Sequence, residues 1–277
     1  MGISLVLGFF DGIHKGHRAV IESAFKFSEN VTLITFKDSP SLYFKGGVEY
    51  ILSRKNSTEK MKSLGVKEIV ELDFSKIVNM QPKEYIEYLV ETYHPISITV
   101  GDDHTFGYNK KGNWAVLDQY SELYHYKQNH VPTIWENNEA VSSTLIKSYL
   151  KRGNVEYANN LLESNFILEG TVIHGAKLGR TIGFPTANIK YPQDIVKLPF
   201  GVYCATVDGK KSIMNWGMKP TVNNTAEPVI EVHIPDFSGD LYGKEIRIEV
   251  LKQIRGEKKF ANLDELKTQI CEDIKKC

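Results

Sequence analysis

A turn of ten residues near the N-terminus constrains the fold of this chain more than any other stretch. Residues 3–7 form an apolar run with the character of a β-strand, and apolar residues at helical spacing resume over residues 18–27. Between them stands the sequence Gly8-Phe9-Phe10-Asp11-Gly12-Ile13-His14-Lys15-Gly16-His17. A strand that enters a helix through such a turn directs free backbone N–H groups and the positive end of the helix dipole toward one point. That arrangement favours a phosphate site.

Two histidines lie at the end of this turn. His14 and His17 are three positions apart, so both rings reach the same point if the helix begins near Lys15. Gly12 and Gly16 leave room for a ligand against the backbone. From these residues alone, two surface histidines on an ordinary strand-to-helix turn are the alternative interpretation.

The size and charge of the chain limit its organisation and its partners. A length of 277 residues favours two domains. Lys plus Arg and Asp plus Glu both number 34, so no overall field attracts nucleic acid, and we expect no nucleic-acid partner. The three cysteines, Cys204, Cys271 and Cys277, have no metal-type spacing, and we expect unpaired, inert thiols in a reducing compartment.

The N-terminal apolar stretch does not have the features of a targeting signal. Residues 1–10 are too few to span a membrane and lack a basic flank, so we expect neither a signal peptide nor a membrane partner. The expected location is the cytoplasm. The sequence does not indicate an oligomeric state.

The first half of the chain alternates strand-like and helix-like segments. Strands are expected at 31–36, 68–72 and 97–100, and helices at 57–64 and 82–93. Such alternation predicts a parallel sheet with helices on both faces, whose ligands lie beyond the carboxyl ends of the strands. A short helix at 155–162 closes this first domain, which we place at residues 1–162.

The second half changes to strands separated by glycine and proline turns. Strand-like segments at 166–173, 201–207, 212–216, 229–234 and 245–254 predict an antiparallel barrel or sandwich over residues 163–277. A terminal helix at 263–274 should pack on it through one apolar face, formed by Leu263, Leu266, Ile270 and Ile274.

The N-terminal motifs resemble those of a known family. The string from Gly8 to His17 is similar to the nucleotide-binding signature of the nucleotidyltransferase superfamily, in the form found in bacterial bifunctional riboflavin kinase/FAD synthetases (riboflavin kinase/FMN adenylyltransferases). Segments 101–107 and 141–147 resemble two further motifs of that family. Taken alone, Ser142 reads as a helix N-cap. The resemblance implies ATP-binding roles for Gly8, Phe10, Asp11, Gly12, His14, Gly16, His17, Ser142, Ser143, Thr144 and Lys147, and a loop that serves FMN adenylylation at Gly101, Asp102, Asp103 and Phe106.

The same segments depart from the family pattern at a few positions. Lys37-Asp38-Ser39-Pro40 stands where members carry a Pro-His pair before the final proline. His104 replaces a phenylalanine, and Lys147 replaces an arginine, which exchanges a two-pronged donor for a point charge. These substitutions concern the adenylyltransferase half only.

The second half resembles the riboflavin kinase signature of the same family. The string 170–188 ends in Pro185-Thr186-Ala187-Asn188, and further matching blocks follow at 201–203, 215–222, 231–234 and 240–243. The resemblance thus covers nearly the whole chain. It implies a nucleotidyltransferase-type parallel α/β domain followed by a riboflavin-kinase-type antiparallel barrel with a C-terminal helix.

The chemistry of residues 175–188 agrees with phosphoryl transfer. The sequence contains no G-x-x-x-x-G-K-[ST] loop, but the glycine-rich turn 175–183 offers N–H groups to phosphate. Thr186 and Asn188 are two apart, so in an extended segment their oxygens share a face and suit Mg²⁺. A plain turn is the alternative. The family places Mg²⁺ and ATP here, which implicates Gly175, Lys177, Gly179, Gly183, Thr186 and Asn188, the last two as metal ligands.

One acidic residue is the candidate catalytic base. Glu231 alternates with Ile230 and Val232 in a predicted strand, and a carboxylate in a small barrel is costly without a function or a partner. A salt bridge to a neighbouring lysine is the alternative. In the family the matching glutamate takes the proton of the ribityl 5′-hydroxyl of riboflavin. The resemblance also places Arg255 and Phe260 in a loop that closes over the flavin.

Two functional hypotheses follow. The first is a bifunctional transferase that uses Mg²⁺-ATP to convert riboflavin to FMN and then FMN to FAD, with these small molecules as its partners. The second is a flavin-binding or flavin-sensing protein, or a kinase alone, whose first domain has lost adenylyltransferase activity. The altered segment 37–40 is the feature that favours the second hypothesis.

Overall fold

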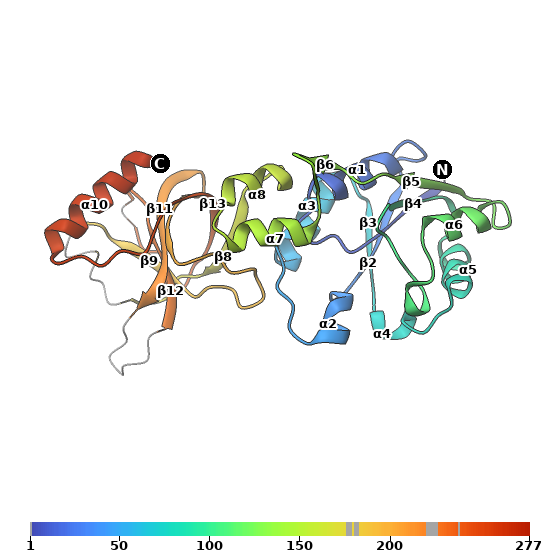
Figure 1. Cartoon of the computed structure of the whole chain (residues 1–277), viewed down its shortest axis with the longest axis horizontal. Coiled ribbons are helices and arrows are strands. Elements are labelled where there is room, and N and C mark those ends of the chain that lie inside the picture. The colour runs from blue at the N-terminus through green and yellow to red at the C-terminus, as the bar shows by residue number, and fades with distance from the viewer. Residues whose placement is uncertain (1, 176–178, 180–182, 220–226, 238) are drawn as a thin grey trace. The chain divides into compact units, whose positions relative to one another are not determined.

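The computed structural model describes residues 2–175, 179, 183–219, 227–237 and 239–277. The chain forms two compact units, Met1–Ser143 and Thr144–Cys277 (Figure 1). The sequence predicts a division near residue 162, whereas the geometric division falls earlier. Helix α8 (Val155–Leu162) packs on strands of the second unit, and Tyr149 of α7 (Ser143–Lys151) packs on Tyr157 of α8. The assignment of one activity to each segment stays a prediction.

The first unit contains a parallel sheet of five strands in the order β3-β2-β1-β4-β5. Because β1 lies in the middle, the turn that follows it opens at the centre of the carboxyl edge of the sheet. A separate two-stranded hairpin, β6-β7, precedes α7. The strands are β1 (Ile3–Leu7), β2 (Val31–Phe36), β3 (Glu68–Leu72), β4 (Pro95–Gly101), β5 (Lys127–Val131), β6 (Trp135–Glu136) and β7 (Glu139–Ala140).

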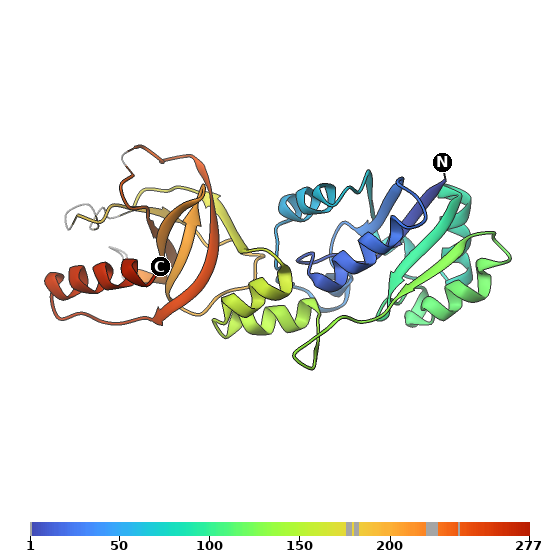
Figure 2. The same ribbon diagram turned by 90° about the horizontal axis from the view of Figure 1, so that it is seen from above.

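Helices cover both faces of this sheet, which confirms the prediction (Figure 2). Leu5 and Leu7 of β1 pack in one core cluster with Leu89 and Leu117. Ser4 alternates to the other face, where its Oγ donates to the carbonyl oxygen of Ala24 at 3.1 Å. The helices are α1 (Lys15–Ala24), α2 (Pro40–Lys45), α3 (Arg54–Ser63), α4 (Phe74–Ile77), α5 (Pro82–Tyr93), η1 (Tyr108–Lys110) and α6 (Trp114–Ser121).

The second unit is an antiparallel sheet of six strands in the order β8-β13-β10-β11-β12-β9. Ile173, just beyond β8, forms a bridge to Asn188 of β9, and its N–H donates to the Asn188 carbonyl oxygen at 2.8 Å. This bridge joins the two ends of the strand order, so the predicted barrel is confirmed. The strands are β8 (Phe166–Thr171), β9 (Thr186–Ile189), β10 (Gly201–Val207), β11 (Lys210–Lys219), β12 (Glu227–His233) and β13 (Glu245–Gly256).

The C-terminal helix α10 (Leu263–Lys276) packs against β10 and β11. Its existence was predicted, but its buried face is not purely apolar. Leu263 is exposed, the other three predicted apolar residues are half-buried, and the one fully buried side chain is that of Asp273.

The expectation of three unpaired thiols is wrong for two of them. Cys204 of β10 and Cys277 form a disulfide with their Cα atoms 5.4 Å apart, although 73 residues separate them in sequence. Their spacing carried no signal, because the contact arises only when α10 lies over β10. Cys271 is a free, exposed thiol. Across the described ranges, every helix is too short or too polar to cross a bilayer.

Candidate active sites

The turn between β1 and α1 has an unusual backbone. Gly12 and Ile13 both have positive φ, 92° and 50°. Glycine adopts this region freely, but a β-branched residue does so only under constraint. Ile13 is fully buried, so core packing holds it there. The chain consequently turns sharply enough to bring His14 to the N-cap of α1.

The two histidines form one cluster at the start of α1. Nδ1 of His14 accepts a hydrogen bond from the His17 N–H at 3.3 Å, and the two rings stack with centroids 3.7 Å apart. Burial, followed by the charge of Lys60, lowers the pKa of His14 to about 4. Burial also lowers the pKa of His17, and the neighbouring His14 and Lys60 lower it further. Both rings are therefore neutral at pH 7.

The tautomer of His14 follows from this contact. A neutral imidazole that accepts at Nδ1 carries its proton on Nε2, which is then a hydrogen-bond donor. Nδ1 of His17 is buried and has no partner in the described part of the chain. The site thus holds two neutral rings with hydrogen-bonding capacity beside a helix N-terminus, a position that favours anions.

Glycines let these rings pack closely. A Cβ on Gly16 would lie 3.2 Å from the His14 ring, and one on Gly8 would lie 2.9 Å from the ring of Phe10. Phe10 in turn contacts His17 edge-on, with ring centroids 5.1 Å apart. Gly8, Phe10 and Gly16 therefore hold the histidine pair in place by packing. This role is separate from the ATP-binding role that the resemblance implies.

Asp11 and Ser143 close the turn against other parts of the unit. Oδ1 of Asp11 accepts from the Ile51 N–H at 2.7 Å, and the Ser143 Oγ donates to the Asp11 carbonyl oxygen at 2.8 Å. Lys60 of α3 donates to the Gly12 carbonyl oxygen at 3.3 Å. Sequence reasoning missed Lys60, because 48 residues separate it from Gly12 and no local pattern marks it.

The four remaining residues with implied ATP-binding roles divide between the two units. Ser142 precedes α7, and Ser143 is its first residue. Thr144 and Lys147 belong to the second unit. Their joint action with His14 and His17 stays a prediction.

The loop after β4 is held by polar contacts and by tight glycine packing. Oδ1 of Asp102 lies 3.0 Å from Nε2 of His130, and Oδ2 accepts from Thr133 Oγ1 at 3.0 Å. These bonds lower the pKa of Asp102, with Thr133 the larger cause. Gly101 ends β4 and the side chain of Asp103 is exposed.

Aromatic packing fixes the other end of that loop. Phe106 is buried and pairs with Gly112, where a Cβ would lie 2.5 Å from the Phe106 ring. His104 stacks on Phe106 with centroids 6.0 Å apart. Its Nε2 has no partner within the described ranges, and burial lowers the pKa of His104 to about 4. Phe106 therefore shapes the loop from inside, and His104 lies buried beside it as a neutral ring.

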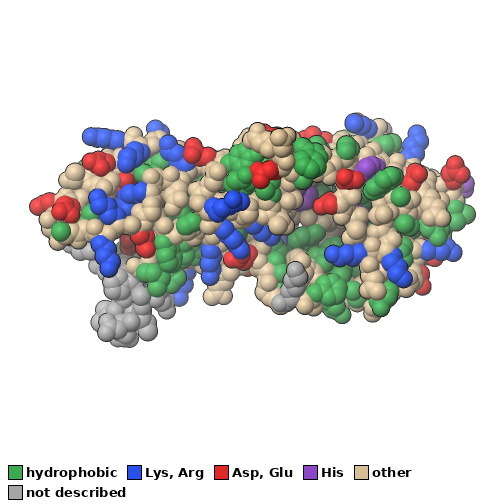
Figure 3. All heavy atoms as spheres, viewed as in Figure 1, with side chains coloured by type: hydrophobic (Ala, Val, Ile, Leu, Met, Phe, Trp, Pro, Cys, Tyr) green, Lys and Arg blue, Asp and Glu red, His purple; other side chains and the backbone are tan. Residues whose placement is uncertain are grey.

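Residues 37–40, where the sequence departs from the family pattern, lead into α2. This helix carries part of an exposed aromatic cluster. Ser39 is the N-cap and its Oγ accepts from Ser41 N at 3.3 Å. Tyr43 and Phe44, 57% and 64% exposed, pack edge-on against Phe74 of α4. Figure 3 shows hydrophobic side chains gathered over α2 and α4. This cluster follows β2 at the carboxyl edge, where sequence reasoning identified the loop but not the rings.

In the second unit, strand register brings the predicted kinase residues together. Glu231 of β12 is the direct partner of Asn188 of β9, and His233 is the partner of Thr186. Directly paired residues of antiparallel strands share a face. Ile230 and Val232 are fully buried on the opposite face, while Glu231 is half-buried. Thr186, Asn188 and Glu231 therefore line one polar surface, outside the apolar core of the barrel.

The segment before β9 packs closely on these residues. A Cβ on Gly175 would lie 2.6 Å from Asn188 Oδ1, and one on Gly179 would lie 2.3 Å from the Phe184 carbonyl oxygen. Gly183 has a φ of 89°. His233, which sequence reasoning did not single out, has its Nδ1 2.9 Å from the Pro185 carbonyl oxygen and so donates to it. Lys177 lies outside the described residues.

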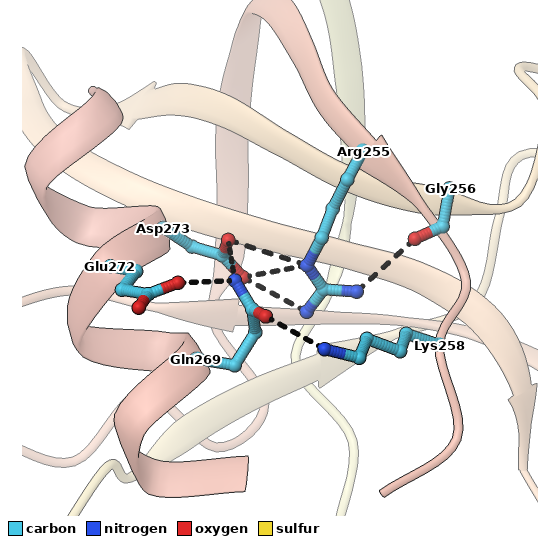
Figure 4. A network of polar contacts seen from close by, with 6 residues as sticks. All are labelled: Arg255, Gly256, Lys258, Gln269, Glu272 and Asp273. Carbon is cyan, nitrogen blue, oxygen red and sulfur yellow. Dashed lines mark hydrogen bonds and ion pairs between the residues drawn. The ribbon is translucent and has the colours of Figure 1, made fainter. Parts of the chain in front are cut away.

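Arg255 lies at the end of β13 and belongs to a polar network with α10 (Figure 4). Its guanidinium pairs with Asp273, with Nη2 and Oδ2 2.9 Å apart. The same guanidinium lies 5.6 Å from the centre of the Phe260 ring. Arg255 belongs to strand β13 and not to a loop, so that part of the expectation is wrong, whereas Phe260 lies beyond the strand. The two side chains nevertheless lie together, as the resemblance implies.

Comparison with known proteins agrees with both halves. Residues 1–145 match the family described as FAD synthetase, and residues 162–277 match the family described as riboflavin kinase. The bifunctional riboflavin kinase/FMN adenylyltransferase of Haemophilus influenzae is 32% identical, over 99% of this chain and 92% of its own. That of Bacillus subtilis is 33% identical, over 97% and 89%. The chain belongs to the bifunctional riboflavin kinase/FMN adenylyltransferase family.

A solved structure shares the whole fold. The crystal structure titled macrolide-efflux protein from Streptococcus pneumoniae has a TM-score of 0.90 and 30% identity, and the match covers 99% of this chain and 93% of that one. Both units therefore occur together in an experimental structure of similar length.

Proposed function

We propose that this chain phosphorylates riboflavin to FMN in its second unit and adenylylates FMN to FAD in its first. The kinase reaction is ATP plus riboflavin to FMN plus ADP, and the adenylyl transfer is ATP plus FMN to FAD plus diphosphate. Membership of the family supports both steps. The single structural observation that carries the kinase assignment is the direct pairing of Glu231 with Asn188, on the same face as Thr186.

Glu231 is the general base of the kinase reaction. Its half-buried carboxylate takes the proton of the ribityl 5′-hydroxyl, whose oxygen then attacks the γ-phosphorus of ATP while ADP leaves. Asn188 stands opposite, so base and ATP-binding residues meet across one strand spacing. Arg255 and Phe260 contact the flavin ring.

Residues of β9 and of the turn before it suit a magnesium-bound nucleotide. Gly175 brings backbone against the Asn188 amide so closely that no side chain fits between them. The hydroxyl of Thr186 and the amide oxygen of Asn188 are the hard oxygen ligands that Mg²⁺ prefers. Mg²⁺ bound there would neutralise phosphate charge during transfer. Gly179, Gly183 and Lys177 complete the ATP site.

In the first unit, backbone and imidazole donors hold the ATP phosphates. The N-terminus of α1, Nε2–H of His14 and the ring of His17 face the same region, and the charge of Lys60 lies within reach of both rings. A phosphate oxygen of FMN attacks the α-phosphorus and diphosphate leaves. Ser142 and Ser143 extend this phosphate site, while Gly101, Asp102 and Asp103 face FMN from the loop after β4. Thr144 and Lys147 are assigned to ATP by the family resemblance alone.

The exposed aromatic cluster of the first unit is a platform for the isoalloxazine ring of FMN. Tyr43 and Phe44 are exposed and pack on the half-buried Phe74, at the same sheet edge as the histidines. Flat aromatic ligands stack on such side chains. This role gives the altered segment 37–40 a function, because Ser39 and Pro40 start the helix that carries two of the rings.

A time course tests the whole proposal. Purified chain is incubated with riboflavin, ATP and Mg²⁺, and the flavins are separated by chromatography. Riboflavin should fall, FMN should rise and then fall, and FAD should accumulate, whereas omission of Mg²⁺ should stop the first step. FMN without FAD under every condition would assign the chain to the kinase-only alternative, and flavin binding without turnover would assign it to flavin sensing. Function on these metabolites fits a cytoplasmic protein.

A further inference from the structure

The most buried residue of the C-terminal helix is a carboxylate. Asp273 is 1% exposed, although the apolar periodicity of α10 predicts Ile270 and Ile274 as its inner positions. A buried carboxylate is costly unless it is paired and hydrogen-bonded. A residue of this kind in a packed helix needs a partner that offsets the free energy lost when its carboxylate leaves water.

Arg255 is that partner, and the geometry is a two-pronged pair (Figure 4). Nε of Arg255 lies 3.0 Å from Oδ2 and 3.3 Å from Oδ1 of Asp273, and Nη2 lies 2.9 Å from Oδ2. Such pairs fix the plane of the guanidinium as well as its position. The Arg255 Nη1 donates to the Gly256 carbonyl oxygen at 3.1 Å, which fixes the remaining edge.

A second layer of contacts holds the carboxylate itself. Nε2 of Gln269, one helical turn before Asp273, donates to Asp273 Oδ1 at 3.1 Å and to Glu272 Oε2 at 3.2 Å. Lys258 donates to Gln269 Oε1 at 3.3 Å. Asp273 thus accepts hydrogen bonds on both oxygens and is held from the helix side, while Arg255 is held from the strand side.

Strand register connects this pair to the proposed kinase residues. Arg255 is the partner of Val202, Val202 of Asn215, and Asn215 of Glu231. The four residues form one row across β13, β10, β11 and β12, on one face of the sheet. Three strand spacings, about 14 Å along a flat sheet, separate the two ends of the row. Because Val202 is buried, the row gives the separation of its ends and not an open groove. A substrate with its reacting hydroxyl at Glu231 must span that separation to meet Arg255 with its other end.

We propose that Asp273 is a positioning residue of the riboflavin kinase reaction, which holds the guanidinium of Arg255 against the ring end of the flavin. Arg255 touches the flavin, and Asp273 acts through Arg255. The inference rests on the proposed kinase function and adds a residue on α10 that fixes how the flavin is bound. Without Asp273, the long side chain of Arg255 would sample many rotamers and would meet the flavin ring in few of them.

Steady-state kinetics of Asp273→Asn test this role. The Michaelis constant for riboflavin should rise about 10-fold to 100-fold, because misplacement of a binding group by about 1 Å has effects of that size. The Michaelis constant for ATP and the conversion of supplied FMN to FAD should stay unchanged. Asp273→Glu should recover part of the loss, since it keeps the charge. Glu272→Gln is the matched control, because it removes a neighbouring acidic charge that does not touch Arg255.

A double-mutant cycle separates positioning from a structural role. In an Arg255→Gln background, Asp273→Asn should cause no further rise in the riboflavin constant, because the side chain through which it acts is already gone. Arg255→Lys keeps a positive charge beside Asp273 but loses the two-pronged donor geometry of the guanidinium. It should therefore fold and should still raise the Michaelis constant for riboflavin. It serves as the decisive variant if Asp273→Asn does not fold.

Each failure has its own signature. An unchanged riboflavin constant in Asp273→Asn, with FMN still formed by the wild-type chain, would overturn the positioning role alone. A parallel rise in the constants for ATP and riboflavin, together with a lower melting temperature in every variant, would show that the pair is structural and would also overturn it. Absence of FMN formation by the wild-type chain would refute the proposed function, and the positioning role with it.

Discussion

The two candidate sites are built in opposite ways. In the first unit, ten consecutive residues carry the glycines and both histidines, and one turn between β1 and α1 places them. In the second unit, Asn188, Glu231 and Arg255 come from three strands, and only antiparallel register aligns them. The first site is therefore specified locally and the second by the whole barrel. A substitution in the first should act at one place, whereas the second depends on pairing across the sheet.

The largest expected effect is that of Glu231→Gln. The variant keeps the shape of the side chain and its strand pairing but removes the base, and positioned general bases contribute about 10²–10⁴-fold. Conversion of riboflavin to FMN should drop by that factor, while supplied FMN is still converted to FAD. Separate assays on each substrate measure this. Loss of both steps would mean that the two sites are not independent, which would contradict their assignment to separate units.

The reciprocal change is His14→Ala together with His17→Ala. FAD formation from FMN should fall about 10²-fold or more, because preorganised donors to the phosphates are lost. Riboflavin phosphorylation should remain near normal, so flavin should accumulate as FMN. Removal of the N-cap at His14 should itself cost about 1 kcal/mol, whereas His17→Ala alone should leave the melting temperature nearly unchanged. Normal FAD synthesis in an unstable double variant would assign the rings to packing.

A smaller effect is expected for Asn188→Ala. Loss of one of two proposed metal ligands should raise the Mg²⁺ and ATP concentrations needed for half-maximal FMN formation about 10-fold, a size typical of changes around a bound metal. The FAD step should respond to Mg²⁺ as in the wild type. Titrations of both steps with Mg²⁺ provide the measurement, and identical curves for variant and wild type would remove Asn188 from the site.

The smallest effect is a pH-dependent difference in stability between the units. Burial holds the pKa of His14 and of His104 at about 4, below the ordinary value of 6.5. Because the unfolded chain takes up these protons more readily, stability is complete above pH 6.5 and falls as the pH drops from 6.5 toward 4.

Hydrogen exchange at pH 7, 6 and 5 can read this difference strand by strand. Amides of β1 should lose protection as the pH falls before those of β10 do. Substitution of His104 by phenylalanine, which cannot take up a proton, should reduce the dependence of stability on pH in the first unit. Equal loss of protection in both units would show that buried histidines do not set their relative stability.

Much of the fold could be predicted because its signals are periodic and local. The alternation of strand-like and helix-like segments predicted the parallel sheet. The strand-like segments separated by turns predicted the barrel. The short strand β9 was missed, although two of its residues were singled out for their chemistry. Helix α1 begins at Lys15, as the spacing of the two histidines required.

The parts that could not be predicted depend on contacts between distant segments. Lys60 reaches Gly12 from another helix, and the rings of Tyr43 and Phe74 meet only because α2 and α4 are neighbours. Asp273 falls on a face whose periodicity indicates apolar residues, since no sequence pattern shows that Arg255 lies opposite. Local patterns identify residue types and elements, but tertiary neighbours decide which polar groups are buried together.

The disulfide between Cys204 and Cys277 turns part of the second unit into a covalent ring. The ring contains β10 from Cys204 onward, β11 to β13 and α10, but it leaves out β8 and β9, which precede Cys204. Closing a loop of this length restricts the unfolded chain by about 4 kcal/mol in the entropic description. The oxidised chain therefore carries Glu231, Arg255 and Asp273 inside a tethered loop, whereas Thr186 and Asn188 lie outside it and are held in the sheet by strand pairing. A dithiol reductant that opens the ring should leave the two groups equally dependent on that pairing.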